Sequence, residues 1–338
     1  MRKNAPETLP NHNTIERAHH LINNWFIANA RDLPWRRADC SPWGVMVSEF
    51  MLQQTPVKRV LPVWEEWMRR WPSPADLASE EPGEAVRAWG RLGYPRRAQR
   101  LHNAARAIVE EHAGKVPADY DQLLALPGVG SYTAAAISVF AFGRRATVID
   151  TNIRRVHARL FSAKALPSKS LTAAETRLAE ALMPNDLGES VLWNESAMEL
   201  GALICTAKNP ECDLCPVRDM CAWRATGCPE AEYTPVGQSW AGTDRQLRGA
   251  MMAVVRAAHS PIPRVLLTDM SVDIAHLPAT IVLDSDVVQL LDSDAGGQLR
   301  RSIAQLRALG SAQEQIDRCY ASLLADSLIR ETNTLVSL

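Results

Sequence analysis

The chain has 338 residues and a formal net charge of −1, which is enough length for about two domains with cores of their own. The near-neutral charge excludes a globally basic nucleic-acid-binding protein, so any contact with nucleic acid depends on local positive charge. There is neither a long apolar run nor an apolar signal core in the opening MRKNAPETLPNHN, which predicts a soluble, cytoplasmic protein without membrane contact.

Helical periodicity dominates the chain up to about residue 228. Residues 1–12 are expected to form a flexible tail, and a helical pattern over 14–26 leads to a segment in which Pro34 is expected to break the helix. The next helix is expected over 45–55 and carries Glu49 among apolar neighbours. Further helices are expected over 60–71, 82–92, 98–112, 120–125, 173–182 and 191–203. No sheet is indicated here, so the pattern predicts one all-α unit.

A Gly-rich turn, Pro127-Gly128-Val129-Gly130, opens a buried helix that Gly143 ends. Ser131 or Thr133 is expected to cap this helix, and its exposed N-terminal amides suit an anion such as phosphate. Asp150 follows, just before a helix expected over 152–161. On this stretch alone a plain connection, with Asp150 or Thr151 as an N-cap, is an equally good interpretation.

Local positive charge is present in two arginine-rich segments. A solvated helix face is the alternative for any one of these side chains. The arginines concerned are Arg87, Arg91, Arg96, Arg97, Arg100 and Arg106 in the first segment and Arg144, Arg145, Arg154, Arg155 and Arg159 in the second.

Four of the seven cysteines form a cluster with the spacing C-x6-C-x2-C-x5-C: Cys205, Cys212, Cys215 and Cys221. In a chain without a secretion signal this cluster indicates a metal site rather than disulfides. Zinc is the alternative occupant, but zinc sites usually use two C-x2-C knuckles. One tight pair flanked by unequal loops instead resembles the 4Fe-4S site of a DNA-repair family. Cys40, Cys228 and Cys319 are interpreted as ordinary thiols.

The C-terminal part differs in character. Residues 229–241 are polar, contain Pro229 and Pro235, and are expected to form a linker. Beyond it, helices are expected over 244–259, 298–309 and 312–326, with an apolar stretch spaced by aspartates over 266–291. A hairpin is expected from 328–330 and 335–337, turned by Thr332-Asn333. Residues 242–338 are therefore predicted to form a small winged-helix-like α+β domain.

Four motifs occur together and in a fixed order: Ser48-Glu49-x-Met51-Leu52-Gln53-Gln54-Thr55, Leu126-Pro127-Gly128-Val129-Gly130, Asp150-x-Asn152, and the cysteine cluster. Over residues 13–228 the sequence thereby resembles the A/G-specific adenine glycosylases of the endonuclease III superfamily. The resemblance implies a helix-hairpin-helix six-helix barrel over about 36–144. It also implies a helical iron-sulfur module from 13–35 plus 145–228, with a 4Fe-4S cluster on Cys205, Cys212, Cys215 and Cys221.

The implied partner is double-stranded DNA containing A:8-oxoguanine or A:G mispairs, bound by a bacterial, nucleoid-associated monomer. The implied reaction is removal of a flipped-out adenine. Glu49 would protonate the base, and Asp150, supported by Asn152, would stabilise the oxocarbenium-like sugar. Tyr132 stands where bifunctional relatives carry a Schiff-base lysine, so the resemblance implies a monofunctional enzyme without efficient strand cleavage.

Further residues match family positions that contact DNA or adenine. Gln54, Thr55 and Tyr94 match residues near the lesion, and Gly128, Gly130 and Ser131 belong to the phosphate-binding hairpin. Arg31, Trp35, Leu52 and Glu195 match positions lining or supporting the adenine pocket. Ordinary packing or surface placement is the alternative for each of them.

One departure from the family and two rival functions stay open. No F-x-H-type segment of a Nudix-like domain follows residue 240, so the chain resembles a truncated actinobacterial-type branch. In this branch 8-oxoguanine would be read by the barrel itself, chiefly through Tyr94, Gln54 and Thr55, or alternatively by the small C-terminal domain. Deleting the chain from about 242 onward is then expected to change discrimination only modestly. The nearest rival is a thymine or other mismatch glycosylase, against which Glu49 in its Met-Leu-Gln-Gln context argues. A non-catalytic iron-sulfur DNA-binding or redox-sensing protein would leave Glu49 and Asp150 without a purpose.

Overall fold

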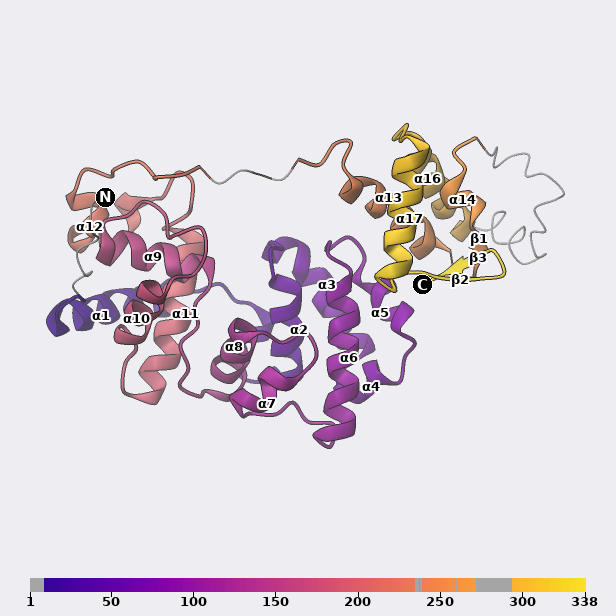
Figure 1. The fold of residues 1–338 in the computed structure, drawn as a ribbon. Helices are drawn as coiled ribbons and strands as arrows, with labels where there is room; N and C mark the ends of the chain where they lie inside the picture. Colours follow the sequence, from indigo (N-terminus) through magenta and orange to yellow (C-terminus); the bar gives the residue numbers. More distant parts are fainter. Residues whose placement is uncertain (1–8, 235–236, 238, 259, 272–293) are drawn as a thin grey trace. The chain divides into compact units, whose positions relative to one another are not determined.

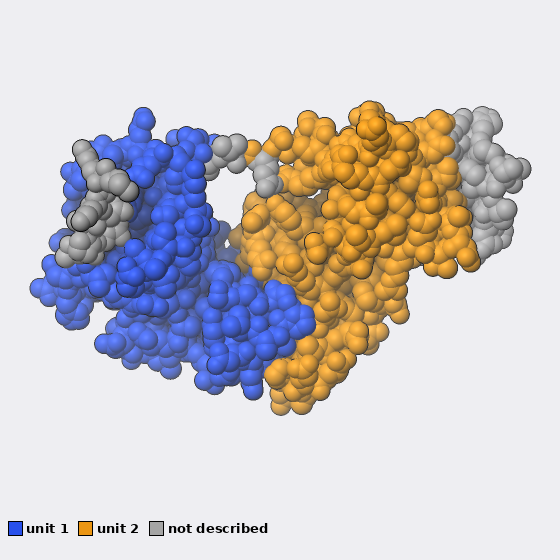
Figure 2. Space-filling model, in the orientation of Figure 1, with its two compact units in different colours: residues 1–49, 116–236 blue, residues 50–115, 237–338 orange. Residues whose placement is uncertain are grey.

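The computed structural model describes residues 9–234, 237, 239–258, 260–271 and 294–338. The chain divides into two compact units, each assembled from two separate segments (Figure 2). Unit 1 comprises residues 1–49 and 116–236, and unit 2 comprises residues 50–115 and 237–338. The division falls within one helix, directly after Glu49. The boundaries expected for the barrel, iron-sulfur module, linker and C-terminal domain stay predictions.

Unit 1 is helical throughout its described residues (Figure 1). Helix α11 packs on α1 and α9, and α7 packs on α8. Helix α8 is buried from Thr133 to Val139, as its small and apolar composition predicts. Its elements are α1 (His12–Asn29), η1 (Pro34–Arg36), α2 (Pro42–Leu52, up to Glu49), α7 (Tyr120–Ala125), α8 (Ser131–Phe142), α9 (Thr151–Ser162), α10 (Ala173–Ala181), α11 (Leu187–Leu203), η2 (Cys212–Leu214), η3 (Arg218–Met220) and α12 (Ala222–Ala225).

The first segment of unit 2 continues α2 and adds four helices. Helices α4 and α5 both pack on α6. Trp67 meets Trp71 and Trp89 edge to face, with ring centroids 4.8 and 5.5 Å away, and this aromatic cluster forms the centre of the packing. The helices are α3 (Val57–Arg70), α4 (Pro74–Ala78), α5 (Pro82–Trp89) and α6 (Arg96–Glu111).

The second segment of unit 2 is a small α+β assembly, as the sequence predicts. Helix α13 packs on α16 and α17, and a three-stranded antiparallel sheet has the order β1-β3-β2. The hairpin β2–β3 is confirmed, although the left-handed turn residues are Asn333 and Thr334, one position later than expected. Strand β1 was not predicted, because two residues are too short for a pattern. The elements are α13 (Asp244–Ala257), β1 (Ile262–Pro263), α14 (Val265–Thr268), α16 (Asp294–Arg307), α17 (Gln313–Ala325), β2 (Arg330–Thr332) and β3 (Leu335–Ser337). Most of the stretch 266–291 lies outside the described residues.

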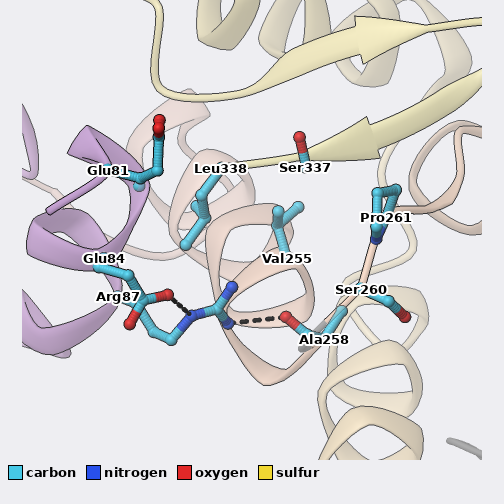
Figure 3. A pocket seen from close by; sticks show the side chains of 10 residues that line it. Glu81, Glu84, Arg87, Val255, Ala258, Ser260, Pro261, Ser337 and Leu338 are labelled. Atoms are coloured by element: carbon cyan, nitrogen blue, oxygen red, sulfur yellow. Dashed lines mark hydrogen bonds and ion pairs between the residues drawn. The ribbon is translucent and has the colours of Figure 1, made fainter.

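Within unit 2 the C-terminal segment packs directly on α5 (Figure 3). The Arg87 guanidinium donates to the Arg256 carbonyl and, at 2.7 Å, to the Ala258 carbonyl, while Arg256 Nε donates to the Val86 carbonyl at 3.2 Å. A Cβ added at Gly83 would lie 2.9 Å from the Leu338 Cβ, so only glycine permits this approach. Backbone carbonyls thus fasten the small assembly to α5.

Two helix boundaries differ from the sequence-based expectation. The helix predicted over 45–55 ends at Leu52, because Gln54 adopts a left-handed φ of 55° and the Thr55 amide turns back to the Leu52 carbonyl. Pro34 does not break the preceding helix: α1 already ends at Asn29, and Pro34 instead begins η1, where a missing amide costs nothing.

Candidate active site and iron-sulfur site

Glu49 is a buried acid near the end of α2. Glu49 is only 6% exposed, and the Tyr132 hydroxyl donates a hydrogen bond to Glu49 Oε2 at 3.1 Å. Burial raises the pKa of Glu49 to about 7, and the nearby Asp150 charge adds to that rise. The Tyr132 hydrogen bond and the Arg36 charge act in the opposite direction. Glu49 can therefore hold a proton near neutral pH, as a general acid must.

Asp150 is both the N-cap of α9 and a neighbour of the acid. Its carboxylate accepts from the Ile153 amide at 2.6 Å and from Asn152 Nδ2 at 2.8 Å. Burial raises the pKa of Asp150 above its ordinary value, while these hydrogen bonds lower it. The sequence predicted hydrogen bonds to Asp150, but it did not predict that burial would outweigh them in setting the Asp150 pKa. The N-cap interpretation and the catalytic interpretation of Asp150 are therefore compatible, because the same carboxylate can serve both purposes.

Tyr132 lies in the first turn of α8. Burial raises the pKa of its phenol well above the ordinary value, and the Glu49 and Asp150 charges raise it further. The phenol is thus a neutral donor that orients the Glu49 carboxyl. It supplies no amine with which a sugar aldehyde could form a Schiff base.

A chain of hydrogen bonds leads from Asp150 to the cysteine cluster. Arg155 Nη2 donates to Asn152 Oδ1 at 2.9 Å and to the Gly201 carbonyl at 2.6 Å, and Arg155 Nε donates to the Cys205 carbonyl at 2.6 Å. A Cβ at Gly201 would lie 2.8 Å from the Asn152 Cβ, so glycine lets α11 approach α9 closely. Arg155 was considered as local surface charge, but it is only 5% exposed and holds backbone instead.

The four clustered cysteines are suited to an iron-sulfur cluster. All are free thiols of intermediate exposure, and burial raises the pKa of Cys215 to about 12, to which the other three cysteines add. Arg159, also buried, donates to Cys205 Sγ at 3.4 Å. Four cysteine thiolates suit a four-iron cluster, because each thiolate binds a different iron.

The hairpin between α7 and α8 exposes backbone donors. Gly128 has φ 80°, and Gly130 is the N-cap of α8 with no side chain capping the helix. The expectation that Ser131 or Thr133 would cap is therefore wrong, because α8 begins at Ser131 and both residues lie within its first turn. Gly130 and Ser131 are exposed, which leaves the N-terminal end of α8 open to an anion.

The predicted lesion-contacting residues differ in exposure. Gln54 and Tyr94 are exposed, Tyr94 at 46%, and both adopt left-handed φ angles of 55° and 48°. Thr55 is buried instead, and its hydroxyl lies 3.3 Å from the Leu92 carbonyl. Thr55 therefore joins two loops, whereas Gln54 and Tyr94 present side chains to solvent.

Arg31, a predicted adenine-pocket residue, binds a carboxylate that the sequence analysis does not single out. Glu199 is fully buried and accepts two hydrogen bonds from the Arg31 guanidinium, at 2.8 and 2.6 Å, and one from Arg36 at 2.9 Å. Burial alone would raise the pKa of Glu199, but the two arginines lower it to about 2. Glu195 lies one turn earlier on α11, and burial raises its pKa. The signal in the sequence that could have pointed to Glu199 is its i, i+4 spacing from Glu195 on one helix.

Trp35 is buried in η1, and Leu52 is the half-buried last residue of α2, in unit 2. The Arg31 guanidinium is occupied by Glu199, which makes it a support rather than a free donor. The residues predicted to be catalytic, Glu49, Tyr132, Asp150 and Asn152, all lie in unit 1.

Comparison with known proteins now defines the class. Residues 47–181 match the HhH-GPD superfamily of base excision DNA repair proteins, and residues 205–221 match the iron-sulfur binding domain of endonuclease III. A solved structure of a thermostable thymine-DNA glycosylase matches with a TM-score of 0.57 at 27% identity, over 63% of this chain and 98% of that one. The fold and the cysteine cluster are those of a helix-hairpin-helix DNA glycosylase with a 4Fe-4S cluster.

The particular family follows from two mycobacterial relatives. An adenine DNA glycosylase of Mycobacterium tuberculosis is 46% identical over 268 residues, which cover 79% of this chain and 86% of the relative. One of Mycolicibacterium smegmatis is 45% identical over 312 residues, 91% of each chain. The chain belongs to the adenine DNA glycosylase family, whose members are hydrolases acting on N-glycosyl bonds. No helix among the described residues is long and apolar enough to cross a membrane.

Proposed function

We propose that this chain excises adenine mispaired with 8-oxoguanine or guanine, with Glu49 as the general acid and Asp150 as the stabiliser of the sugar cation. The observation that supports this proposal is the buried Glu49 carboxyl. It is hydrogen-bonded to Tyr132 at 3.1 Å, and burial raises its pKa to about 7 beside Asp150. Two neighbouring carboxyl groups in different environments are what a paired acid and electrostatic stabiliser require.

The reaction begins with a proton transfer. Protonated Glu49 donates to the five-membered ring of the flipped adenine, the N-glycosyl bond breaks, and its electron pair leaves with the base. The cationic sugar that remains is stabilised by the Asp150 carboxylate, which Asn152 and the Ile153 amide hold in place. Water then adds to the sugar and returns a proton to Glu49, which restores the starting state.

The enzyme is proposed to be monofunctional. Tyr132 orients Glu49 and offers no amine, so the product is an intact strand with an abasic site. The exposed N-terminal end of α8 binds a DNA phosphate, helped by Gly128 and Gly130. Gln54 and Tyr94 enter the base stack near the lesion, and the protein acts as a monomer.

Cys205, Cys212, Cys215 and Cys221 hold the 4Fe-4S cluster. When bound, the cluster cross-links the loops of α11, η2 and η3 through iron–thiolate bonds. Arg155 and Arg159 tie those loops to α9, and therefore to Asn152 and Asp150. The purified protein should be brown, and a colourless protein holding one zinc ion would contradict the assignment.

A single-turnover assay on defined duplexes tests the function. Adenine is placed opposite 8-oxoguanine, guanine or thymine, and thymine opposite guanine, and abasic sites are opened with alkali. Strand breaks at adenine opposite 8-oxoguanine and guanine, absent from the normal A:T pair, are expected. Excision of thymine from G:T would favour the thymine glycosylase alternative, and no excision from any duplex would favour a non-catalytic protein.

A further inference from the structure

Two exposed side chains of unit 2 stand on unfavourable backbone. Gln54 and Tyr94 adopt left-handed φ angles of 55° and 48°, a region that residues with a Cβ rarely occupy. Neither residue belongs to a helix: Gln54 follows α2, and Tyr94 precedes α6. Such backbone persists only where surrounding contacts enforce it.

Those contacts converge on one buried arginine. Arg97, only 5% exposed, donates through Nη1 to the carbonyls of Phe50 at 3.0 Å, Met51 at 3.1 Å and Gln53 at 2.5 Å. Through Nη2 it donates to the Thr55 hydroxyl at 3.1 Å and the Gly93 carbonyl at 3.1 Å. One guanidinium therefore bonds the backbone before Gln54, the side chain of the residue after it, and the residue before Tyr94.

The chemistry of these partners suits a permanent cation. The last carbonyls of α2 lack helical partners and carry partial negative charge, which a guanidinium at the helix end satisfies. Burial lowers the pKa of Arg97 to about 10, so it stays charged at neutral pH. Its guanidinium also lies over the Tyr94 ring, 5.5 Å from the centroid, and over Trp89 at 5.2 Å. No carboxylate is among its hydrogen-bond partners in the described chain.

We propose that Arg97 is a positioning residue that holds Gln54 and Tyr94 in one fixed arrangement and thereby sets how strongly the enzyme discriminates the base opposite adenine. The inference rests on the proposed function, because it takes these two side chains as the contacts near the lesion. The hydrogen bonds of Arg97 reach the two loops that carry Gln54 and Tyr94, so its influence passes through these loops.

The Arg97→Lys variant tests the proposal, because an ammonium keeps the charge but cannot bond all of these acceptors on two loops. Arg106→Lys, on the exposed face of the same helix, is the matched control. Single-turnover rates are measured on adenine opposite 8-oxoguanine, opposite guanine, and opposite an abasic analogue that offers no base to discriminate. We expect the ratio of the first two rates to fall about tenfold for Arg97→Lys and to stay unchanged for the control.

The third duplex separates positioning from general damage. Its rate should fall much less than the 8-oxoguanine rate, whereas an equal loss on all three duplexes would overturn the proposal. In a Gln54→Ala, Tyr94→Ala background, Arg97→Lys should change the ratio no further, because its effect passes through those residues. An additional loss in that background, or an unchanged ratio in the single variant, would also overturn it.

A second variant covers the case in which Arg97→Lys does not fold. Thr55→Val removes one acceptor of Arg97 and should lower the same ratio in the same direction by a smaller factor. Folding is followed by thermal denaturation and by the visible absorption of the cluster. If the unmodified protein excised no adenine from any duplex, the proposed function would fail. If the unmodified protein clearly preferred adenine opposite 8-oxoguanine and the Arg97 and Thr55 variants kept that preference, only the inference about Arg97 would fail.

Discussion

The active-site region of unit 1 and the Gln54–Tyr94 region of unit 2 use buried polar groups in opposite ways. In unit 1, burial raises the pKa of Glu49 to about 7, and in the proposed mechanism Glu49 acts by giving up its proton. In unit 2, buried Arg97 stays charged and binds carbonyl groups, so its contribution is geometric. The proposed role of the first region depends on which side chains are present. The proposed role of the second depends on the backbone conformation of the two loops that carry Gln54 and Tyr94.

The largest expected effect tests the chemical half of this comparison. Asp150→Asn removes the charge but keeps an N-cap, because asparagine also accepts the Ile153 amide hydrogen bond. The single-turnover rate should fall by about 100-fold or more, while the dissociation constant for mispaired DNA changes little. A near-normal rate would remove Asp150 from the mechanism, and the 4Fe-4S absorption serves as the folding control.

The Glu49→Gln variant measures how much a buried, ionisable Glu49 lowers the free energy of unfolding, separately from its proposed role as the acid. Burial raises the Glu49 pKa from 4.5 to about 7, so the stability that its protonated form contributes is fully present below about pH 4.5 and is lost as the pH rises through about 7. Glutamine stays neutral. The inactive variant should therefore be more stable than the unmodified protein by roughly 3 kcal/mol at about pH 8, and the gap should narrow toward pH 4.5.

Thermal or denaturant unfolding across this pH range measures the effect, with Glu65→Gln on the surface of α3 as a control. An equal difference at all pH values would mean that Glu49 does not change its protonation between the folded and unfolded states.

The smallest expected effect concerns the C-terminal segment. Deleting residues from about 242 onward removes the contacts of Arg256 and Leu338 with α5, and should lower the melting temperature of unit 2. Discrimination between 8-oxoguanine and guanine should change only modestly, because Arg97 and all of its hydrogen-bond partners lie within residues 50–97. Loss of a large 8-oxoguanine preference in a folded truncation would identify the C-terminal segment as the lesion reader.

Much of this architecture could be predicted from the sequence, because helical periodicity, the Gly-rich turn and the cysteine spacing are local signals. Helix α7 and the end of α8 at Gly143 lie where expected. Glu49, Asp150 and the four cysteines are recognisable because their chemistry is fixed by residue type. The class of cofactor followed from the same spacing.

The missed features are those that depend on tertiary burial. Arg97, Arg155 and Arg159 occur in arginine-rich segments whose simplest interpretation is a solvated face, yet each is at most 5% exposed and bonded to backbone carbonyls. The sequence singles out Glu195 only by its match to a family position, whereas the glutamate that Arg31 and Arg36 contact is Glu199, which tertiary packing decides. The helix predicted over 45–55 runs three residues past Leu52 because nothing in Gln53-Gln54-Thr55 marks a stop, although Gln54 adopts a left-handed φ.

The pH dependence of the single-turnover rate on A:8-oxoguanine duplexes tests the central claim most directly. The rate should fall about tenfold per pH unit above about 7, as Glu49 loses its proton. In Tyr132→Phe this fall should move to higher pH, because the Tyr132 hydrogen bond lowers the Glu49 pKa. A rate that instead rises through pH 7 would show that Glu49 works as a base in the bond-breaking step, and would contradict the assignment.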